Sequence, residues 1–159
     1  MAREKRASDV LRRVAEEHLK YEREMLDATA HLLAAGVHDP HVRFALLESF
    51  TIHLRALIDF MWPTGARPDD VIASDFFPTP AAWAEVAPVL PDALEPAKTR
   101  VGKEIAHLTY ARLDVAKEEK PWSHVEMADA MIAALRVFIE SAPEDTIGRL
   151  KEAVREPTG

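Results

Sequence analysis

Hydrophobic residues recur at helical spacing along nearly the whole chain, and this periodicity is the feature that most restricts the fold. With only 5 Gly among 159 residues, the sequence offers little material for hairpin turns or strands. A chain of this length can bury enough surface to fold without a disulfide or metal staple. We therefore predict a single all-α domain over residues 1–159, a bundle of four main helices plus a short C-terminal helix.

Capping residues set the expected helix bounds. Ser8 is a predicted N-cap, and Gly36 is placed to end the first helix in a left-handed conformation. Asp39 followed by proline opens the second helix, and Ser123 with Glu126 matches a capping box. The predicted helices are 8–35, 40–62, 93–115, a fourth from Ser123, and a short last one from Pro143 to about Arg155, with acids in its first turn and bases in its last.

The first helix carries one apolar stripe that needs a partner helix. It consists of Leu11, Val14, Tyr21, Met25, Leu32 and Leu33 at spacings of three and four residues. His18 falls in the same stripe. We expect a packed, hydrogen-bonded histidine there, with a role as a ligand as the alternative.

The second helix is apolar around most of its circumference, which predicts the central position in the bundle. Glu48, Arg55 and Asp59 form a charged seam, because at 100° per residue they lie within about 20° of one line. Burying these charges without partners would cost several kcal/mol each, so the seam must face itself, water or a site. Two interpretations stay open, an i,i+4 pair of Arg55 with Asp59 and a site-lining role.

Residues 63–92 form an irregular stretch that holds six of the 11 prolines. We expect short helical turns at about 69–74 and 80–87, the second opened by Thr79-Pro80. Phe76, Phe77 and Trp83 are predicted to pin this stretch to the core. The alternatives are a lid over a substrate, or a small-ligand pocket formed by the same three residues with Trp62.

Composition excludes several classes of function. The absence of Cys rules out thiol catalysis and cysteine-type zinc sites. A net charge of −7 argues against broad, non-specific DNA binding. The N-terminus has no apolar run typical of a signal peptide, and no segment approaches the roughly 20 apolar residues of a membrane span. We expect a cytoplasmic protein with no membrane partner.

The segment 99–113 carries the strongest chemical signal. Arg100 and His107 differ by only about 20° in helical phase, with Lys103 and Glu104 on either side, while the apolar residues cluster on another face. An imidazole can exchange protons with a hydroxyl nucleophile or leaving oxygen, and a guanidinium can hold phosphate oxygens in pairs. With RNA, the ribose 2′-hydroxyl can serve as the nucleophile without a metal. Glu104-x-x-His107 is only half of a di-metal pattern, so we expect no metal and no cofactor.

This Arg-x6-His spacing near the end of a helix resembles the HEPN superfamily, and HLRALIDF at 53–60 is similar to the second helix of some members. The resemblance implies a small helical domain acting as a metal-independent ribonuclease, often a toxin or defence component. It also implies a homodimer in which two Arg/His sets meet. By the same resemblance, His107 is the general acid or base and Arg100 the phosphate clamp. Helix phase adds Lys103, Glu104, Tyr110 and the charged seam as site-lining candidates.

The expected partners are RNA, a second copy of the chain and an antitoxin-like protein. Residues 98–112 carry four basic side chains and one acidic one within an acidic chain, which favours a small, selective phosphate site. The alternative function is a non-catalytic helical module that binds a protein partner or a nucleotide. In that case Arg100 pairs with Glu104, and His107 bonds the charged seam.

Overall fold

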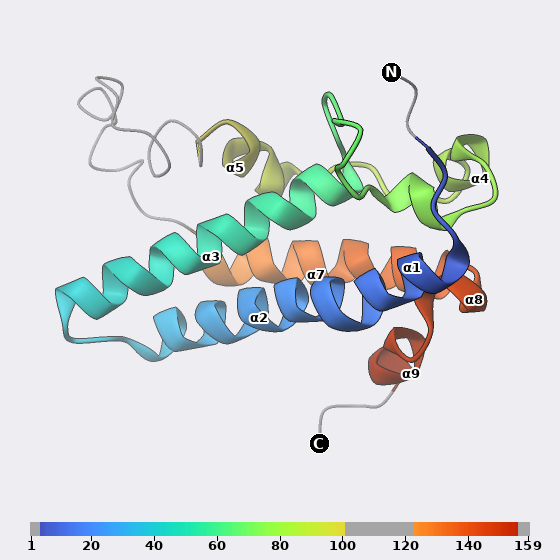
Figure 1. Ribbon diagram of the computed structural model, residues 1–159. Helices are drawn as coiled ribbons and strands as arrows, with labels where there is room; N and C mark the ends of the chain where they lie inside the picture. Colours follow the sequence, from blue (N-terminus) through green and yellow to red (C-terminus); the bar gives the residue numbers. More distant parts are fainter. Residues whose placement is uncertain (1–3, 101–122, 156–159) are drawn as a thin grey trace.

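All regular structure in the computed structural model is helical over the residues that it describes, which are 4–100 and 123–155, with side chains for all but 99, 100 and 153–155 (Figure 1). The predicted all-α class is therefore confirmed over these ranges. The principal elements are α1 (Ser8–Arg13), a π-helical turn (Val14–Leu19, the π-turn below), α2 (Lys20–Ala35), α3 (Pro40–Met61), α5 (Glu95–Arg100), α7 (His124–Ser141), α8 (Glu144–Ile147) and α9 (Leu150–Arg155). In the part described, none of the helices is long and apolar enough to cross a bilayer.

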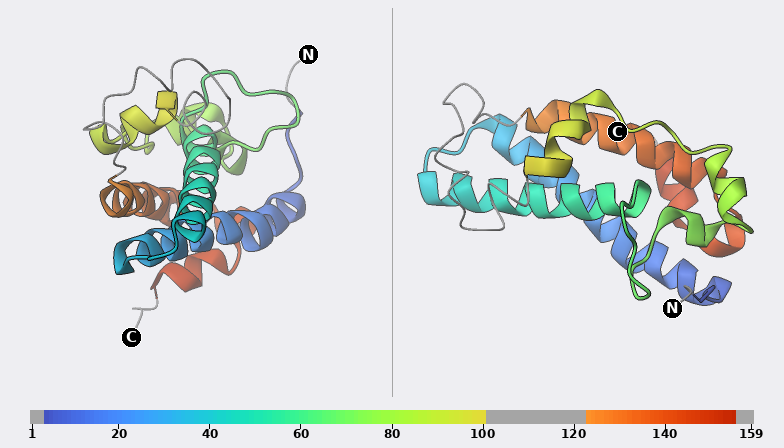
Figure 2. Two further views of the ribbon diagram at one scale, coloured as in Figure 1. Left: turned by 90° about the vertical axis from the view of Figure 1, so that its left-hand side faces the viewer. Right: turned by 90° about the horizontal axis from the view of Figure 1, so that it is seen from above.

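Three long helical segments enclose the core. The α1–π-turn–α2 rod runs antiparallel to α3, and α7 packs against both α2 and α3 (Figures 1 and 2). Phe50, Leu54 and Leu57 of α3 are almost completely buried, and Leu26 of α2 and Phe138 of α7 meet them in one cluster. Burial of large apolar side chains of this kind, at about 1.5–3 kcal/mol each, is the main favourable term that holds the helices together.

Two predicted helix starts are confirmed at atomic detail. The Asp39 carboxylate accepts from the backbone N–H groups of His41 and Val42 at 2.8 and 3.1 Å, which satisfies two of the free donors at the start of α3. Thr79 likewise accepts from Ala82 N–H at 3.2 Å to open α4 (Pro80–Ala84). A polar cap followed by proline is therefore a reliable signal in this chain.

Of the other predicted caps, Ser8 is wrong, while Ser123 and Gly36 are confirmed in position but not in geometry. Ser8 is the first helical residue of α1 rather than its N-cap, and its hydroxyl donates to Asp145 at 2.8 Å. Ser123 does precede α7, but its side chain makes no capping hydrogen bond, so the capping box does not form. Gly36 ends α2 with φ +82° as expected, although its ψ of 116° lies outside the left-handed helical region. Gly148, at φ +56° and ψ −141°, divides the predicted last helix into α8 and α9.

The π-turn explains why the predicted stripe of the first helix is partly wrong. Within this turn the Lys20 N–H donates to the Ala15 carbonyl, an i→i+5 bond that takes one residue more than an α-turn. The residues that are buried along this rod are Leu11, Ala15, Leu19, Leu26, Thr29 and Ala30. Tyr21 and Leu32, which the prediction placed inside, are each 51% exposed.

The proline-rich stretch after α3 is anchored by aromatic side chains, as predicted. Phe76, Phe77 and Trp83 are buried and pack against Phe138, with Phe60 completing the cluster. The first helical turn lies at Ala73–Phe76 rather than at 69–74, and α4 follows. These three aromatics fill the core, so they do not form the alternative ligand pocket.

The N-terminal part of the helical rod is held to the C-terminal elements by side-chain hydrogen bonds. The Ser8 hydroxyl donates to Asp145, and the Arg149 N–H donates to the Glu16 carboxylate at 2.9 Å. These two contacts fix α1 and the π-turn to α8 and to the residue before α9 (Figure 1). Lys5 Nζ donates to the Pro78 carbonyl at 3.0 Å and so ties the start of the chain to the loop before α4.

Candidate functional site

The predicted catalytic residues lie at or beyond the edge of the described structure. The last described residue of α5 is Arg100, whose side chain is outside the described set. The other predicted site residues of this segment, Lys103, Glu104, His107 and Tyr110, lie wholly outside the described residues. Before that point the chain is well anchored, because Leu94 and Ala97 are buried and α5 packs against α3. The convergence of Arg100 and His107 stays a prediction.

The charged seam lies on the outer side of α3. Arg55 Nε and Asp59 Oδ2 are 3.5 Å apart, and both side chains are about half exposed. Glu48 is exposed about two turns before Arg55. The seam therefore avoids the burial cost by facing water, and an exposed i,i+4 pair of this kind contributes at most about 0.5 kcal/mol to stability.

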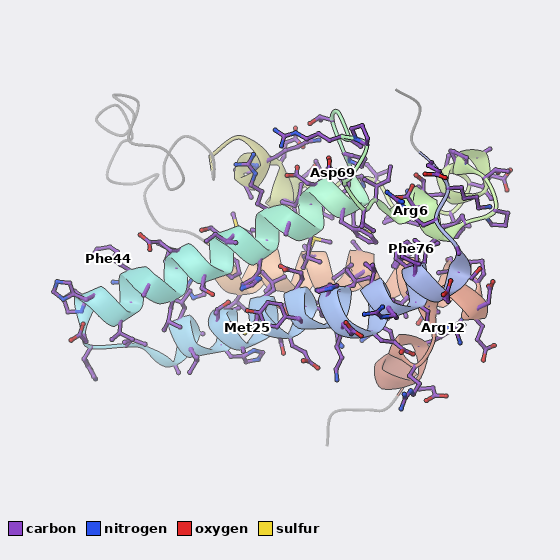
Figure 3. The ribbon with its side chains drawn as sticks, in the orientation of Figure 1. Arg6, Arg12, Met25, Phe44, Asp69 and Phe76 are labelled. Carbon is purple, nitrogen blue, oxygen red and sulfur yellow. The ribbon has the colours of Figure 1, made fainter. Side chains whose placement is uncertain are left out.

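Arg55 and Asp59 also line a hollow between α3 and the loop that follows it. This hollow has a volume of about 500 Å³. Its far wall is formed by residues 63–67, Asp70 and Val71, in the loop on which Asp69 is labelled in Figure 3. The loop is shaped by Asp70, whose carboxylate accepts from the Arg67 N–H at 2.6 Å. Part of the proline-rich stretch thus borders a surface hollow, while its aromatic part is buried.

A second, more apolar hollow of about 230 Å³ adjoins the first, since both are lined by Ala56, Phe60 and Val71. Its other walls come from three elements. The π-turn contributes Val14, His18 and Leu19, α2 contributes Glu22, and α3 contributes Leu57. We refer to the two hollows together as the α2–α3 trough. His18 is exposed at its rim, so the prediction of a packed histidine is wrong.

One ionisable pair lies at the edge of the trough and was not anticipated. His53 Nδ1 and Glu22 Oε2 are 2.7 Å apart, with the side chains 10% and 29% exposed. The ring of Tyr21 meets the imidazole edge-on at a centroid distance of 5.4 Å. With the proton on Nδ1, a neutral imidazole donates to the carboxylate, and the pair carries one net negative charge.

A detectable signal for this pair was present in the sequence. Glu22 lies three residues after the buried Leu19 and four before the buried Leu26, at helical spacing for the inner face. The predicted stripe took the apolar Tyr21 as the core residue, and Glu22 was therefore overlooked. The π-turn is the reason, because the extra residue moves the inner face from position 21 to position 22.

Nothing else in the described structure identifies the chemistry. Over residues 4–100 and 123–155, no group of three or more His, Asp or Glu residues is arranged to hold a metal ion. Comparisons with protein-family models, with curated proteins and with solved structures find no match to this chain. We therefore infer the function from the residues themselves.

Proposed function

We propose that this protein is a metal-independent endoribonuclease of HEPN type that acts as a homodimer. The observation that carries the proposal is the spacing of Arg100 and His107 in a basic segment of an acidic chain, which predicts that the two residues share a helical face. The helical fold of the described residues and the anchoring of α5 up to Arg100 support it.

The proposed reaction is an attack of the ribose 2′-oxygen on the adjacent phosphorus. His107 takes the 2′-hydroxyl proton or delivers one to the departing 5′-oxygen, and Arg100 holds the non-bridging oxygens. The P–O5′ bond breaks as the P–O2′ bond forms, which leaves a 2′,3′-cyclic phosphate and a 5′-hydroxyl. Lys103, Glu104, Tyr110 and the seam of Glu48, Arg55 and Asp59 are the candidates for lining this site.

Incubation of the purified protein with total RNA and a chelator tests the proposal directly. We expect cleavage that leaves cyclic phosphate ends, with His107→Ala lowering the rate about a hundredfold or more. His41→Ala is the matched control, because the His41 side chain is 94% exposed at the start of α3. Absence of cleavage, or equal rates for the two variants, would disprove the ribonuclease proposal.

Mixing two inactive variants tests the dimeric site separately. If each site takes Arg100 from one subunit and His107 from the other, heterodimers of Arg100→Ala and His107→Ala regain one complete site. We expect the mixture to recover part of the wild-type rate, whereas each variant alone stays inactive. If the mixture stays inactive although native mass spectrometry shows the mixed dimer, the shared site is wrong even when the wild-type protein cleaves RNA.

The second candidate function is a non-catalytic module that binds a protein partner or a nucleotide. One observation favours a protein partner, because Phe44, which is labelled in Figure 3, and Ile52 are 63% and 60% exposed. Their spacing of eight residues, with Glu48 midway, places them on one side of α3. This function predicts no RNA cleavage and a loss of several degrees in Tm for His107→Ala, as expected of a packed histidine. An unchanged Tm together with lost cleavage would exclude it.

A further inference from the structure

We propose that the apolar half of the α2–α3 trough is a binding site for a small hydrophobic ammonium compound, with Glu22 as the residue that receives the charged group. The proposed site is the hollow of about 230 Å³ lined by the π-turn, α2, α3 and Val71. None of the residues that line this hollow is a proposed catalytic residue, so the inference does not depend on the proposed ribonuclease activity.

The walls of this hollow are suited to an apolar body. Val14 is partly buried. The side chains of Leu57 and Phe60 also line the hollow, and these residues are only 1% and 7% exposed. The volume holds roughly eight water-sized groups, which is the size of one aromatic ring with a short chain. Contact with these side chains removes apolar ligand surface from water, which favours binding.

The polar end of the site is defined by the charge of the Glu22 carboxylate. Glu22 Oε2 is bound to His53, and within the described structure Oε1 has no hydrogen-bond partner. A carboxylate can accept several hydrogen bonds, and this one is shielded by the bundle, since its side chain is only 29% exposed. When the imidazole is neutral the pair is anionic, so an ammonium group is favoured over a carboxylate or a neutral hydroxyl.

The π-turn is the element that builds this arrangement. Beyond its extra residue, Glu22 lines the hollow, whereas the ring of Tyr21 contacts His53 of α3 and is not among the lining residues. Regular α-geometry would give a better hydrogen-bond ladder, and π-turns are frequently found at functional sites. The same turn places Val14 and His18 on the rim, so one irregularity supplies three of the lining residues.

Calorimetric titration of the full-length protein with three probes of one shape tests the proposal. The probes are 2-phenylethylamine, 2-phenylethanol and 3-phenylpropionate, which differ in the charge of the polar end. We expect saturable binding of the amine, with affinity about tenfold or more above that of the alcohol and the acid. Equal binding of all three probes, or no saturable binding of the amine, overturns the proposal.

Two pairs of variants locate the bound probe. Glu22→Gln should weaken amine binding about tenfold or more, whereas Glu24→Gln, on the exposed side of the same helix, should leave it unchanged. Ala56→Leu should block the hollow, and Ala45→Leu on the exposed face of α3 is its control. Because Ala56 is itself exposed, Ala56→Leu tests the site even if Glu22→Gln does not fold. Binding that survives Ala56→Leu places the amine elsewhere and disproves this site.

Discussion

The Glu22–His53 contact shows how a charged residue comes to occupy an inner position of a helical bundle. Each group on its own would lose hydration without compensation, and the 2.7 Å hydrogen bond between them offsets that cost. Tyr21 then covers the imidazole with the edge of its ring. The stabilisation therefore belongs to the pair rather than to either residue.

A double-mutant cycle measures this coupling. We expect Glu22→Ala and His53→Ala each to lower the free energy of unfolding by about 1–3 kcal/mol, because each leaves a shielded polar partner without its hydrogen bond. The double variant should lose less than the sum, with a coupling of about 1 kcal/mol, measured by urea denaturation. The exposed pair His31 and Asp27, 3.3 Å apart on the same helix, is the control and should couple by less than about 0.5 kcal/mol. Equal coupling in the two cycles would contradict the argument.

At the scale of elements, the π-turn behaves as one inserted residue in an otherwise regular helix. The buried positions Leu11, Ala15 and Leu19 are spaced by four and four, whereas an α-helical stripe alternates between three and four. Removing one residue between Ala15 and Leu19 restores that alternation. Both ends of the rod would then keep their present inner faces.

Deleting Glu17 is therefore expected to be tolerated, because it converts the π-turn to α-helix without rotating α2 relative to α1. Deleting the exposed Ala28 instead rotates everything after it by about 100° and moves Ala30 away from the core. Circular dichroism and thermal melting should show a folded protein for the first deletion and a Tm lower by many degrees, or no folding, for the second. Similar losses for both would show that the π-turn is not a simple insertion.

The element scale also shows how far sequence could predict the structure. Periodicity and the Asp39-Pro40 and Thr79-Pro80 caps placed the long helices and α4 correctly, because those signals are local. The π-turn has no local signature, so the inner face after Leu19 was misassigned and Glu22 was overlooked. Ser8 failed as a cap for a similar reason, since its hydroxyl is taken by Asp145, a residue 137 positions away. Pairing across such distances is decided by tertiary packing.

At the scale of the whole molecule, Gly148 is a point of close approach between the C-terminal elements and the first helical rod. A Cβ at this position would collide with the Glu16 carboxylate and the Arg12 side chain, and φ of +56° with ψ of −141° is a conformation that favours glycine. The Glu16 carboxylate cannot retreat freely, because it also accepts from the Arg149 N–H. Both the backbone conformation of Gly148 and its close contact with Glu16 and Arg12 therefore disfavour a side chain at this position.

We expect Gly148→Ala to lower the free energy of unfolding by about 1–3 kcal/mol or more. Gly36→Ala should cost less, since φ is +82° but nothing lies within 4 Å, and Gly65→Ala, which also has open space, should be nearly neutral. Guanidinium denaturation of the three variants gives this order. A Gly148→Ala variant as stable as Gly65→Ala would show that the close approach to Glu16 and Arg12 is not rigid.

Three hydrogen bonds between distant parts of the sequence affect how the chain can fold as it is synthesised. They join Lys5 to Pro78, Ser8 to Asp145 and Glu16 to Arg149. α1 is translated well before its partner α8, since the bonded residues Ser8 and Asp145 are 137 positions apart. Until α8 has been made, the face of α1 that it covers has no native neighbour from that side, and the long loop to be closed slows such a step. During synthesis, the docking of α1 therefore waits until residues 144–147 have left the ribosome.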